Sequence, residues 1–118
     1  MRAEYPGFGR IVIDGKTYDH DVVVYPSGRV EKRKKWLSKN KHGTSHRFDL
    51  EELREYLKED FDVLLIGTGA YGMLSLLPGG RKLVKGKEVI ELPTGKAIEK
   101  FSELSGRKRV LAVFHITC

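Results

Sequence analysis

The strongest constraint on the fold is an apolar run that leads into closely spaced glycines, residues 61–72. Residues 61–66 are apolar except for Asp62, which is typical of a strand covered on both faces. Three glycines follow, at Gly67, Gly69 and Gly72. Since ligands of open α/β sheets bind beyond the carboxyl ends of the strands, we expect any site to lie at this turn.

Further strands are predicted on either side of this run. Asp14-Gly15 stands between two strand-like runs and predicts an N-terminal β-hairpin, because both turn residues take positive φ. The second hairpin strand is expected to resume at residues 22–25. Residues 88–92 and 110–116 predict two more strands. Only His115 interrupts the apolar faces of residues 110–116, so this strand is expected in the middle of the sheet.

Helices are predicted between the strands. Asp49 is expected to cap the first, and Glu52, three residues later, to complete a capping box. Thr94 is expected to cap the second, which Gly106 terminates. Residues 81–87 fit either a short helix or an open loop.

The predicted elements run β-β-α-β-(α)-β-α-β. A hairpin followed by a βαβ-like half predicts an α/β fold with a mixed sheet and helices packed on it. The 118 residues contain no repeat and no long linker, so one domain, residues 1–118, is expected.

No apolar run is long enough to cross a membrane and no secretory signal is visible, so we expect a cytoplasmic protein. The lack of Gln, with Lys, Arg and Glu in abundance, resembles the composition of heat-adapted proteins.

The net charge of +6 is concentrated in residues 29–47, which we expect to form a long ordered loop. This segment holds eight Lys or Arg and one acid, Glu31, so it carries +7 and the remainder carries −1. One interpretation is a solvated basic loop. The other is nucleic-acid binding through phosphate neutralisation. No RNA-binding aromatic signature or recognition-helix pattern supports the second interpretation, so we favour the first.

The Gly67-Thr68-Gly69 turn also has two interpretations. Glycines allow backbone N–H groups to approach an anion, and Thr68 adds a hydroxyl. However, the glycine spacing does not match a dinucleotide fingerprint, and the Lys-Ser/Thr ending of a phosphate loop is missing. A tight turn that needs positive φ is therefore the simpler interpretation.

No residue set indicates catalysis or a metal. His42 and His46 have the spacing of metal ligands on a helix, but Gly43 lies between them and no third ligand is close in sequence. Cys118 is the only cysteine, which excludes an internal disulfide and a Cys-based zinc cluster. We expect no catalytic residue, metal or cofactor. An enzyme would need His46 or His115 as an acid or base in the cleft of the turn.

Several scattered residues together resemble one family. They are Tyr25-Pro26-Ser27-Gly28, Trp36, His46, the strand and turn of residues 63–69, Leu92-Pro93-Thr94, Ala97, and His115-Ile116-Thr117-Cys118. Nearly the whole chain resembles the small domains of unknown function typified by the adipogenesis-associated protein, a family related to a mitochondrial complex I assembly factor. The resemblance implies a compact three-layer α/β fold and no established catalytic activity.

The resemblance also implies a pocket near the turn. Its lining and closing residues would be Gly67, Thr68, Gly69, Tyr71, Thr94, Trp36 and His46. We favour a binding or assembly module that recognises a protein partner or a small anionic ligand there, as a monomer or a homodimer. The alternatives are a small enzyme acting on an anionic metabolite and, less favoured, nucleic-acid binding through residues 29–47.

Overall fold

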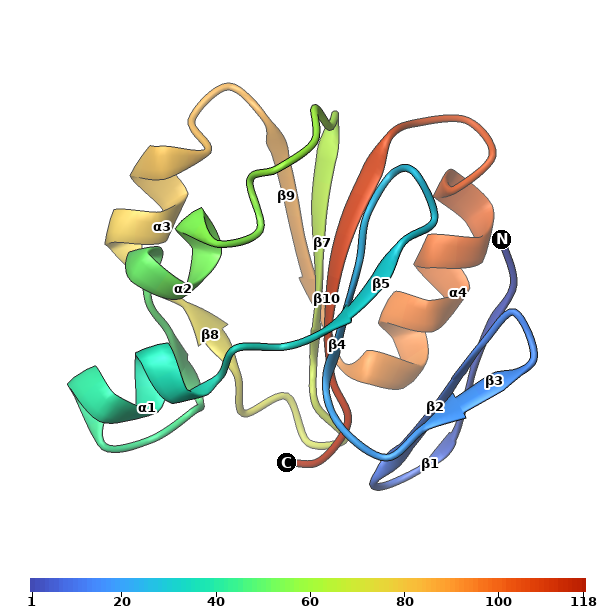
Figure 1. Ribbon diagram of the computed structural model, residues 1–118, viewed down its shortest axis with the longest axis horizontal. Coiled ribbons are helices and arrows are strands. Elements are labelled where there is room, and N and C mark those ends of the chain that lie inside the picture. Colours follow the sequence, from blue (N-terminus) through green and yellow to red (C-terminus); the bar gives the residue numbers. More distant parts are fainter.

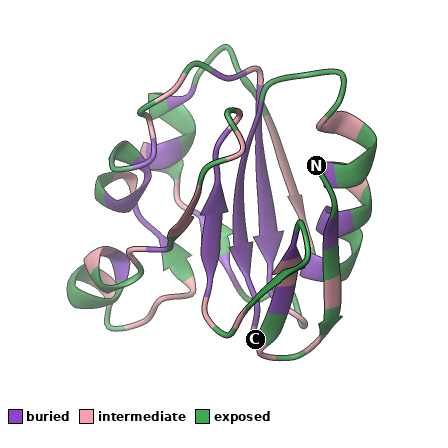
Figure 2. Cartoon of the chain, turned by 45° about the vertical axis from the view of Figure 1, so that its right-hand side comes forward, coloured by how far each residue is buried: buried purple, intermediate pink, exposed green.

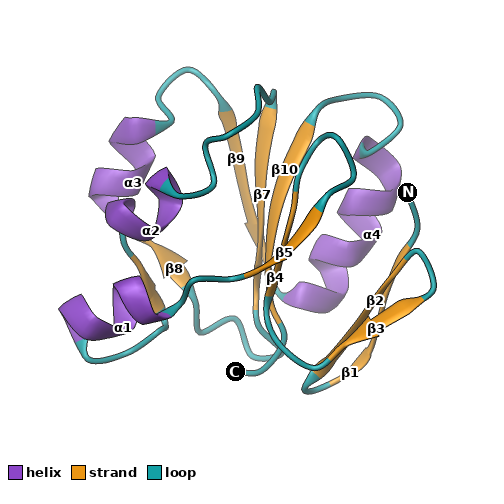
Figure 3. Cartoon of the chain, viewed as in Figure 1, coloured by secondary structure: helices purple, strands orange, loops and turns teal.

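The computed structural model describes residues 1–118 and has three layers around a mixed five-stranded sheet (Figures 1 and 3). The strands are β1 (Ala3–Gly7), β2 (Arg10–Ile13), β3 (Lys16–Tyr18), β4 (Val22–Val24), β5 (Val30–Lys32), β6 (Arg47–Phe48), β7 (Val63–Thr68), β8 (Ser75–Leu76), β9 (Glu88–Leu92) and β10 (Val110–His115). The helices are α1 (Trp36–His42), α2 (Leu50–Arg54), α3 (Pro78–Leu83) and α4 (Thr94–Leu104). None of these helices combines the length and apolarity that crossing a membrane requires.

The last strand is the middle strand of the main sheet, as predicted. The strand order is β5-β4-β10-β7-β9. β10 is parallel to β7, with His115 beside Thr68, and antiparallel to β4, with Val113 beside Val23. Since β9 is parallel to β7 and β5 is antiparallel to β4, the predicted mixed sheet is confirmed.

The main sheet separates two apolar cores, and its central strands are buried along their length (Figure 2). On one face, α4 and the sheet β1-β2-β3 cover residues such as Phe114, whose ring meets Phe101 edge-on at 5.6 Å. On the other face, α2, α3 and the short β6-β8 pair cover Leu111 and Val113. The alternation of side chains along β10 supplies both cores.

The N-terminal hairpin is confirmed, but its second strand is shorter than predicted. Asp14 and Gly15 have φ of +47° and +82° and join β2 to β3. Residues 22–24 do not continue this hairpin, and instead form β4 in the main sheet. All three valines of β4 are fully buried, so the strand needs cover on both faces, which the three-stranded sheet does not offer.

The helices differ from the prediction at several boundaries. Residues 29–47 are not a loop, because they form β5, α1 and the start of β6. Asp49 caps α2 by accepting a hydrogen bond from the N–H of Glu51 at 3.0 Å, whereas the predicted capping box is absent. α3 runs from Pro78 to Leu83, so only the first part of the ambiguous residues 81–87 is helical and residues 84–87 form a turn. Pro93, and not Thr94, occupies the cap position of α4.

The turn after β7 is packed tightly against the C-terminal residues. Gly69 has a φ of +104°, and a Cβ placed on it would lie 2.3 Å from the main-chain carbonyl carbon of Cys118. The N–H of Ala70 donates to the carbonyl of Thr117 at 2.6 Å, and the N–H of Met73 donates to that of Cys118 at 3.0 Å. Position 69 therefore requires glycine for both its backbone angle and the close approach.

Gly69→Ala is expected to lower the free energy of unfolding by at least about 3 kcal/mol, because it adds a main-chain clash to the cost of positive φ. Gly86→Ala is the matched control: Gly86 has a φ of +94° and open space around it. That change should cost only about 1 kcal/mol. Urea denaturation of the two variants measures the difference, and equal losses would contradict the close approach.

Candidate functional site

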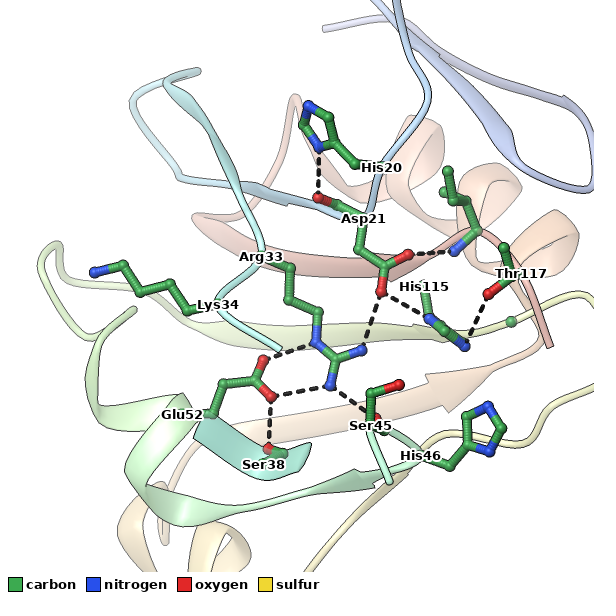
Figure 4. Close-up of polar contacts among 12 residues, drawn as sticks. His20, Asp21, Arg33, Lys34, Ser38, Ser45, His46, Glu52, His115 and Thr117 are labelled. Carbon is green, nitrogen blue, oxygen red and sulfur yellow. Dashed lines mark hydrogen bonds and ion pairs between the residues drawn. The ribbon is translucent and has the colours of Figure 1, made fainter. Parts of the chain in front are cut away.

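The structure brings four ionisable side chains together in the interior, beside the carboxyl ends of β7 and β10 (Figure 4). We call Asp21, Arg33, Glu52 and His115 the buried charge cluster. The side chain of Arg33 is fully buried and lies between two carboxylates. Its Nε donates to Glu52 at 2.8 Å and its Nη1 donates to Asp21 at 3.0 Å. Its Nη2 donates to Glu52 and to the carbonyl of Ser45, both at 2.9 Å.

Strand pairing and helix packing place these groups. Asp21 precedes β4 and Arg33 follows β5, and the N–H of Arg33 donates to the carbonyl of Asp21 at 3.0 Å. Glu52 extends inward from α2 and also accepts hydrogen bonds from the hydroxyls of Ser38 at 2.6 Å and Tyr56 at 2.7 Å. Burial and the charge of Glu52 raise the pKa of Tyr56. The cluster thus joins α1, α2 and one edge of the main sheet.

Asp21 connects Arg33 to the end of β10. Its carboxylate lies 2.7 Å from Nδ1 of His115 and accepts the N–H of Ile116 at 2.8 Å. Burial acts to raise the pKa of Asp21, but the hydrogen bond from His115 and the charges of His115 and Arg33 outweigh it. The pKa therefore lies below its usual range. Asp21 is ionised at neutral pH and holds His115 by its Nδ1 side.

His46 lies against the exposed side of this cluster. Its ring meets the ring of His115 edge-on, with 5.5 Å between the centroids. Burial, followed by the nearby charges of His115 and Arg33, lowers the pKa of His46 below 6.5. His46 is therefore neutral near pH 7 and can act as a hydrogen-bonding group or a base.

The predicted turn residues are joined to the cluster through Thr94. The N–H of Gly69 donates to the Thr94 hydroxyl at 2.9 Å, and that hydroxyl donates to the carbonyl of His115. Thr68 is buried and lies beside His115 in the sheet register. Because the N–H groups of Gly69 and Ala70 both donate to acceptors of the chain itself, they are engaged in holding the turn.

Of the other predicted site residues, His46 is joined to the segment after the turn, whereas Trp36 is not. The carbonyl of His46 accepts the N–H of Ser75 at 2.9 Å, which places His46 next to the segment that follows the turn. No hydrogen bond or ring contact joins Trp36 to the turn, and half of its surface is exposed on α1, which packs against α2 and β6. Two surface cavities, of about 450 and 440 Å³, are lined by other residues. The pocket at the turn stays a prediction.

An exposed apolar surface lies at the end of the molecule that contains the turn. We call Phe8 and Tyr71, together with Met73 two residues further along the chain, the aromatic surface; they are 57%, 75% and 53% exposed. The rings of Phe8 and Tyr71 lie 6.3 Å apart. Next to Phe8, Gly9 donates its N–H to the carbonyl of Ile116 at 2.8 Å. Both rings are thus held beside the C-terminal segment.

Four of the eight cations in the basic segment, residues 29–47, form ion pairs within the chain. Its ion-paired cations are Arg29 with Glu31, Arg33 with the cluster, Lys34 with Glu55, and Lys41 with Asp49. Its cations without an ion pair are Lys32, Lys35, Lys39 and Arg47. Nucleic-acid binding by this segment stays a prediction.

Asp21, Arg33 and Glu52 were missed as a group by the sequence analysis. Arg33 stands among lysines, so its charge indicates a surface residue. Glu52 fits the capping box that the structure does not contain. The only signal was Asp21 directly before a run of valines, where a charged residue at the end of a buried strand needs a partner.

The comparisons with known proteins assign the chain to a family. The model of the family described as "Protein of unknown function (DUF498/DUF598)" matches residues 4–115. The chain belongs to the DUF498/DUF598 family. This confirms the expected uncharacterised domain, while links to the adipogenesis-associated protein or to complex I assembly are not shown. No curated protein matches the chain.

Solved structures of other proteins agree with the fold. A conserved hypothetical protein from Pyrococcus horikoshii OT3 is 62% identical, with full coverage of both chains and a TM-score of 0.97. The protein MT938 is 35% identical over 99% of this chain and 98% of its own, with a TM-score of 0.84. A protein from Bordetella parapertussis, 19% identical over 98% of this chain and 96% of its own, shares the fold with a TM-score of 0.70.

Arg33→Met is expected to lower the free energy of unfolding by about 3–5 kcal/mol, because it leaves the carboxylates of Asp21 and Glu52 buried without their cation. Arg47→Met, at an exposed arginine without an ion pair, is the matched control and should change stability by less than about 0.5 kcal/mol. Urea denaturation at pH 7 measures both. Similar small losses in the two variants would show that the cluster contributes little to stability.

His46 is expected to titrate below 6.5, the ordinary value for histidine, when its ring protons are followed by NMR. Because the folded state favours the neutral form of His46, the contribution of His46 to the free energy of unfolding is lost as the pH falls below 6.5. In His115→Asn the midpoint should move upward, because one source of repulsion is removed. A midpoint at or above 6.5 in the parent protein contradicts this account.

Proposed function

We propose that this protein is a binding or assembly module that docks a protein partner on the aromatic surface beside the Gly-Thr-Gly turn. The observation that carries the proposal is the exposure of Phe8, Tyr71 and Met73. Aromatic residues and methionine are enriched in protein interfaces, and large aromatic side chains dominate their energetics.

Hydrogen bonds to the C-terminal segment hold the backbone beneath this surface. The hydroxyl of Tyr5 donates to the carbonyl of Ile116 at 2.8 Å, and Ala70, which precedes Tyr71, is bonded to Thr117. The rings of Phe8 and Tyr71 are therefore presented by backbone that is already ordered. Little conformational entropy is lost on docking at such a surface, which favours affinity.

A protein partner is favoured over a small anion. An anion at the turn would need free backbone donors, and the N–H groups of Gly69 and Ala70 already donate within the chain. The resemblance to the adipogenesis-associated protein and to a complex I assembly factor adds to the case for an assembly role. A partner that offers apolar side chains to two exposed rings fits the surface best.

Cross-linking from a photoreactive amino acid at position 71 tests the proposal, with position 83 as the control. Leu83 is also an exposed apolar residue, 37% accessible, but it lies on α3. In a lysate, position 71 should form discrete adducts that an excess of unlabelled parent protein removes. The Phe8→Ser protein should compete at least tenfold less well, because it lacks half of the ring pair.

Two results would contradict the proposal. One is the same adducts from position 83 as from position 71. The other is equal competition by the parent and the Phe8→Ser protein. Because Phe8 is exposed, its substitution should leave the free energy of unfolding within about 0.5 kcal/mol of the parent, and thermal melting of the competitor checks this.

One observation favours the alternative of a small enzyme. His115 is paired beside Thr68, and its carbonyl is joined through Thr94 to Gly69. A histidine at the turn is the geometric requirement for that alternative.

A further inference from the structure

We propose that the hydroxyl of Thr117 is a nucleophile that Asp21 and His115 activate, so that Thr117 accepts the acyl group of a small uncharged ester. This reactivity goes beyond partner docking and concerns a different set of side chains. Three observations carry it: the orientation of His115, the accessibility of Thr117, and the charge of the surroundings.

The contact with Asp21 fixes the orientation of His115. Nδ1 of His115 lies 2.7 Å from one oxygen of Asp21, and Arg33 donates to that same oxygen at 3.0 Å. A carboxylate that accepts from a buried guanidinium is ionised, so the facing Nδ1 carries the proton. In the neutral ring, Nε2 then presents its lone pair on the opposite side.

The hydroxyl of Thr117 lies on that opposite side. Its Oγ1 is 3.5 Å from Nε2 of His115, and Figure 4 shows the three side chains in sequence. A carboxylate that orients an imidazole, which in turn contacts a hydroxyl, is the arrangement that activates weak nucleophiles. Such contacts are often long in the free protein and shorten when a substrate binds.

Thr117 is the only residue of this array that is partly accessible. Asp21 and His115 are 5% and 2% exposed, whereas Thr117 is partly accessible. The N–H groups of Thr117 and Cys118 donate to no acceptor of the chain. Two backbone donors without an acceptor in the chain therefore belong to the nucleophile's own residue and the next one, and free backbone donors can stabilise the charge that develops on a carbonyl oxygen under attack.

The surrounding charge selects an uncharged substrate. The reaction requires His115 as a neutral base, and beside that form Arg33 contributes one positive charge while Asp21 and Glu52 contribute two negative charges, so these three groups sum to −1. Burial strengthens this field because the interior screens charge less than water. An ester that carries a carboxylate or a phosphate is repelled, whereas an uncharged acyl ester is not.

The reaction is a transfer of an acyl group to oxygen. Oγ1 of Thr117 attacks the carbonyl carbon while its proton passes to Nε2 of His115. The bond from the carbonyl carbon to the leaving oxygen then breaks, and the leaving alkoxide or phenoxide takes that proton or departs as the anion. The product is an ester of Thr117, which water hydrolyses to the acid and the free threonine.

The probe is 4-nitrophenyl acetate, and the readout is the rate of acetylation at each threonine, from peptide mapping by mass spectrometry. The Cys118→Ala protein is the parent for this experiment, because a free thiol also attacks such esters. Thr17 is an internal reference, since it is exposed on β3 and makes no contact with a histidine. We expect Thr117 to be acetylated about 100-fold faster than Thr17, at the low end of what an oriented base contributes.

Variants distinguish activation of Thr117 by His115 from a reaction rate that reflects only the exposure of Thr117. Thr117→Ser should retain the modification at position 117 and Thr117→Val should lose it, while both keep the fold because the residue is partly exposed. His115→Asn keeps a donor toward Asp21 but lacks the base, so acetylation of Thr117 should fall to the rate of Thr17. A 4-nitrophenyl ester with a carboxylate on its acyl group should react at least tenfold more slowly than the acetate.

Thr117 reacting no faster than Thr17 in the folded Cys118→Ala protein overturns the proposal, as does an unchanged rate in a folded His115→Asn protein. If His115→Asn does not fold, the comparison of Thr117 with Thr17 still decides the outcome. Equal rates for the charged and uncharged esters overturn the assigned class of substrate. None of these results depends on the aromatic surface.

Discussion

The fully buried guanidinium of Arg33 is the interaction on which the rest of the structure depends. It lies between Asp21, before β4, and Glu52, on α2, and it donates to both carboxylates and to the carbonyl of Ser45. Each of these charges would be costly to bury alone. Together they fix α1 and α2 against the edge of the sheet, although an apolar set of the same shape can be equally stable. The cluster therefore specifies an arrangement more than it adds stability.

The same network determines the geometry at the C-terminal end of β10. Asp21 holds both the ring of His115 and the backbone of Ile116. Ile116 in turn accepts hydrogen bonds from Tyr5 and Gly9, and the next two residues accept from the turn after β7. The aromatic surface and the Thr117 hydroxyl are both presented by this segment. The buried ion pair of Arg33 and Asp21 thus supports both the aromatic surface and the Thr117 hydroxyl, which differ in chemistry.

Elements that depend on a local sequence pattern were predicted from the sequence. Contacts between residues that are distant in sequence were missed. The apolar character of both faces of residues 110–116 identified the central strand, and Asp14-Gly15 identified the hairpin turn. Arg33 could not be found, because a basic run has no periodicity that distinguishes a buried cation from exposed ones. Glu52 satisfied a local capping rule, but Arg33, 19 residues away in sequence, binds it instead. Long-range electrostatics overrode a local preference worth about 1 kcal/mol.

The position of β10 in the sheet has a consequence for how the protein is made. Its neighbours β4 and β7 are synthesised well before it, and neither pairs with the other. The strand pairs β5-β4 and β7-β9 therefore become one sheet only when β10 lies between them. Insertion of β10 forms contacts between residues that are distant in sequence. Such contacts form more slowly than local strand pairs. Before β10 is in place, the edges of β4 and β7 that it covers have no partner, and unpaired strand edges make an incompletely folded chain prone to aggregation.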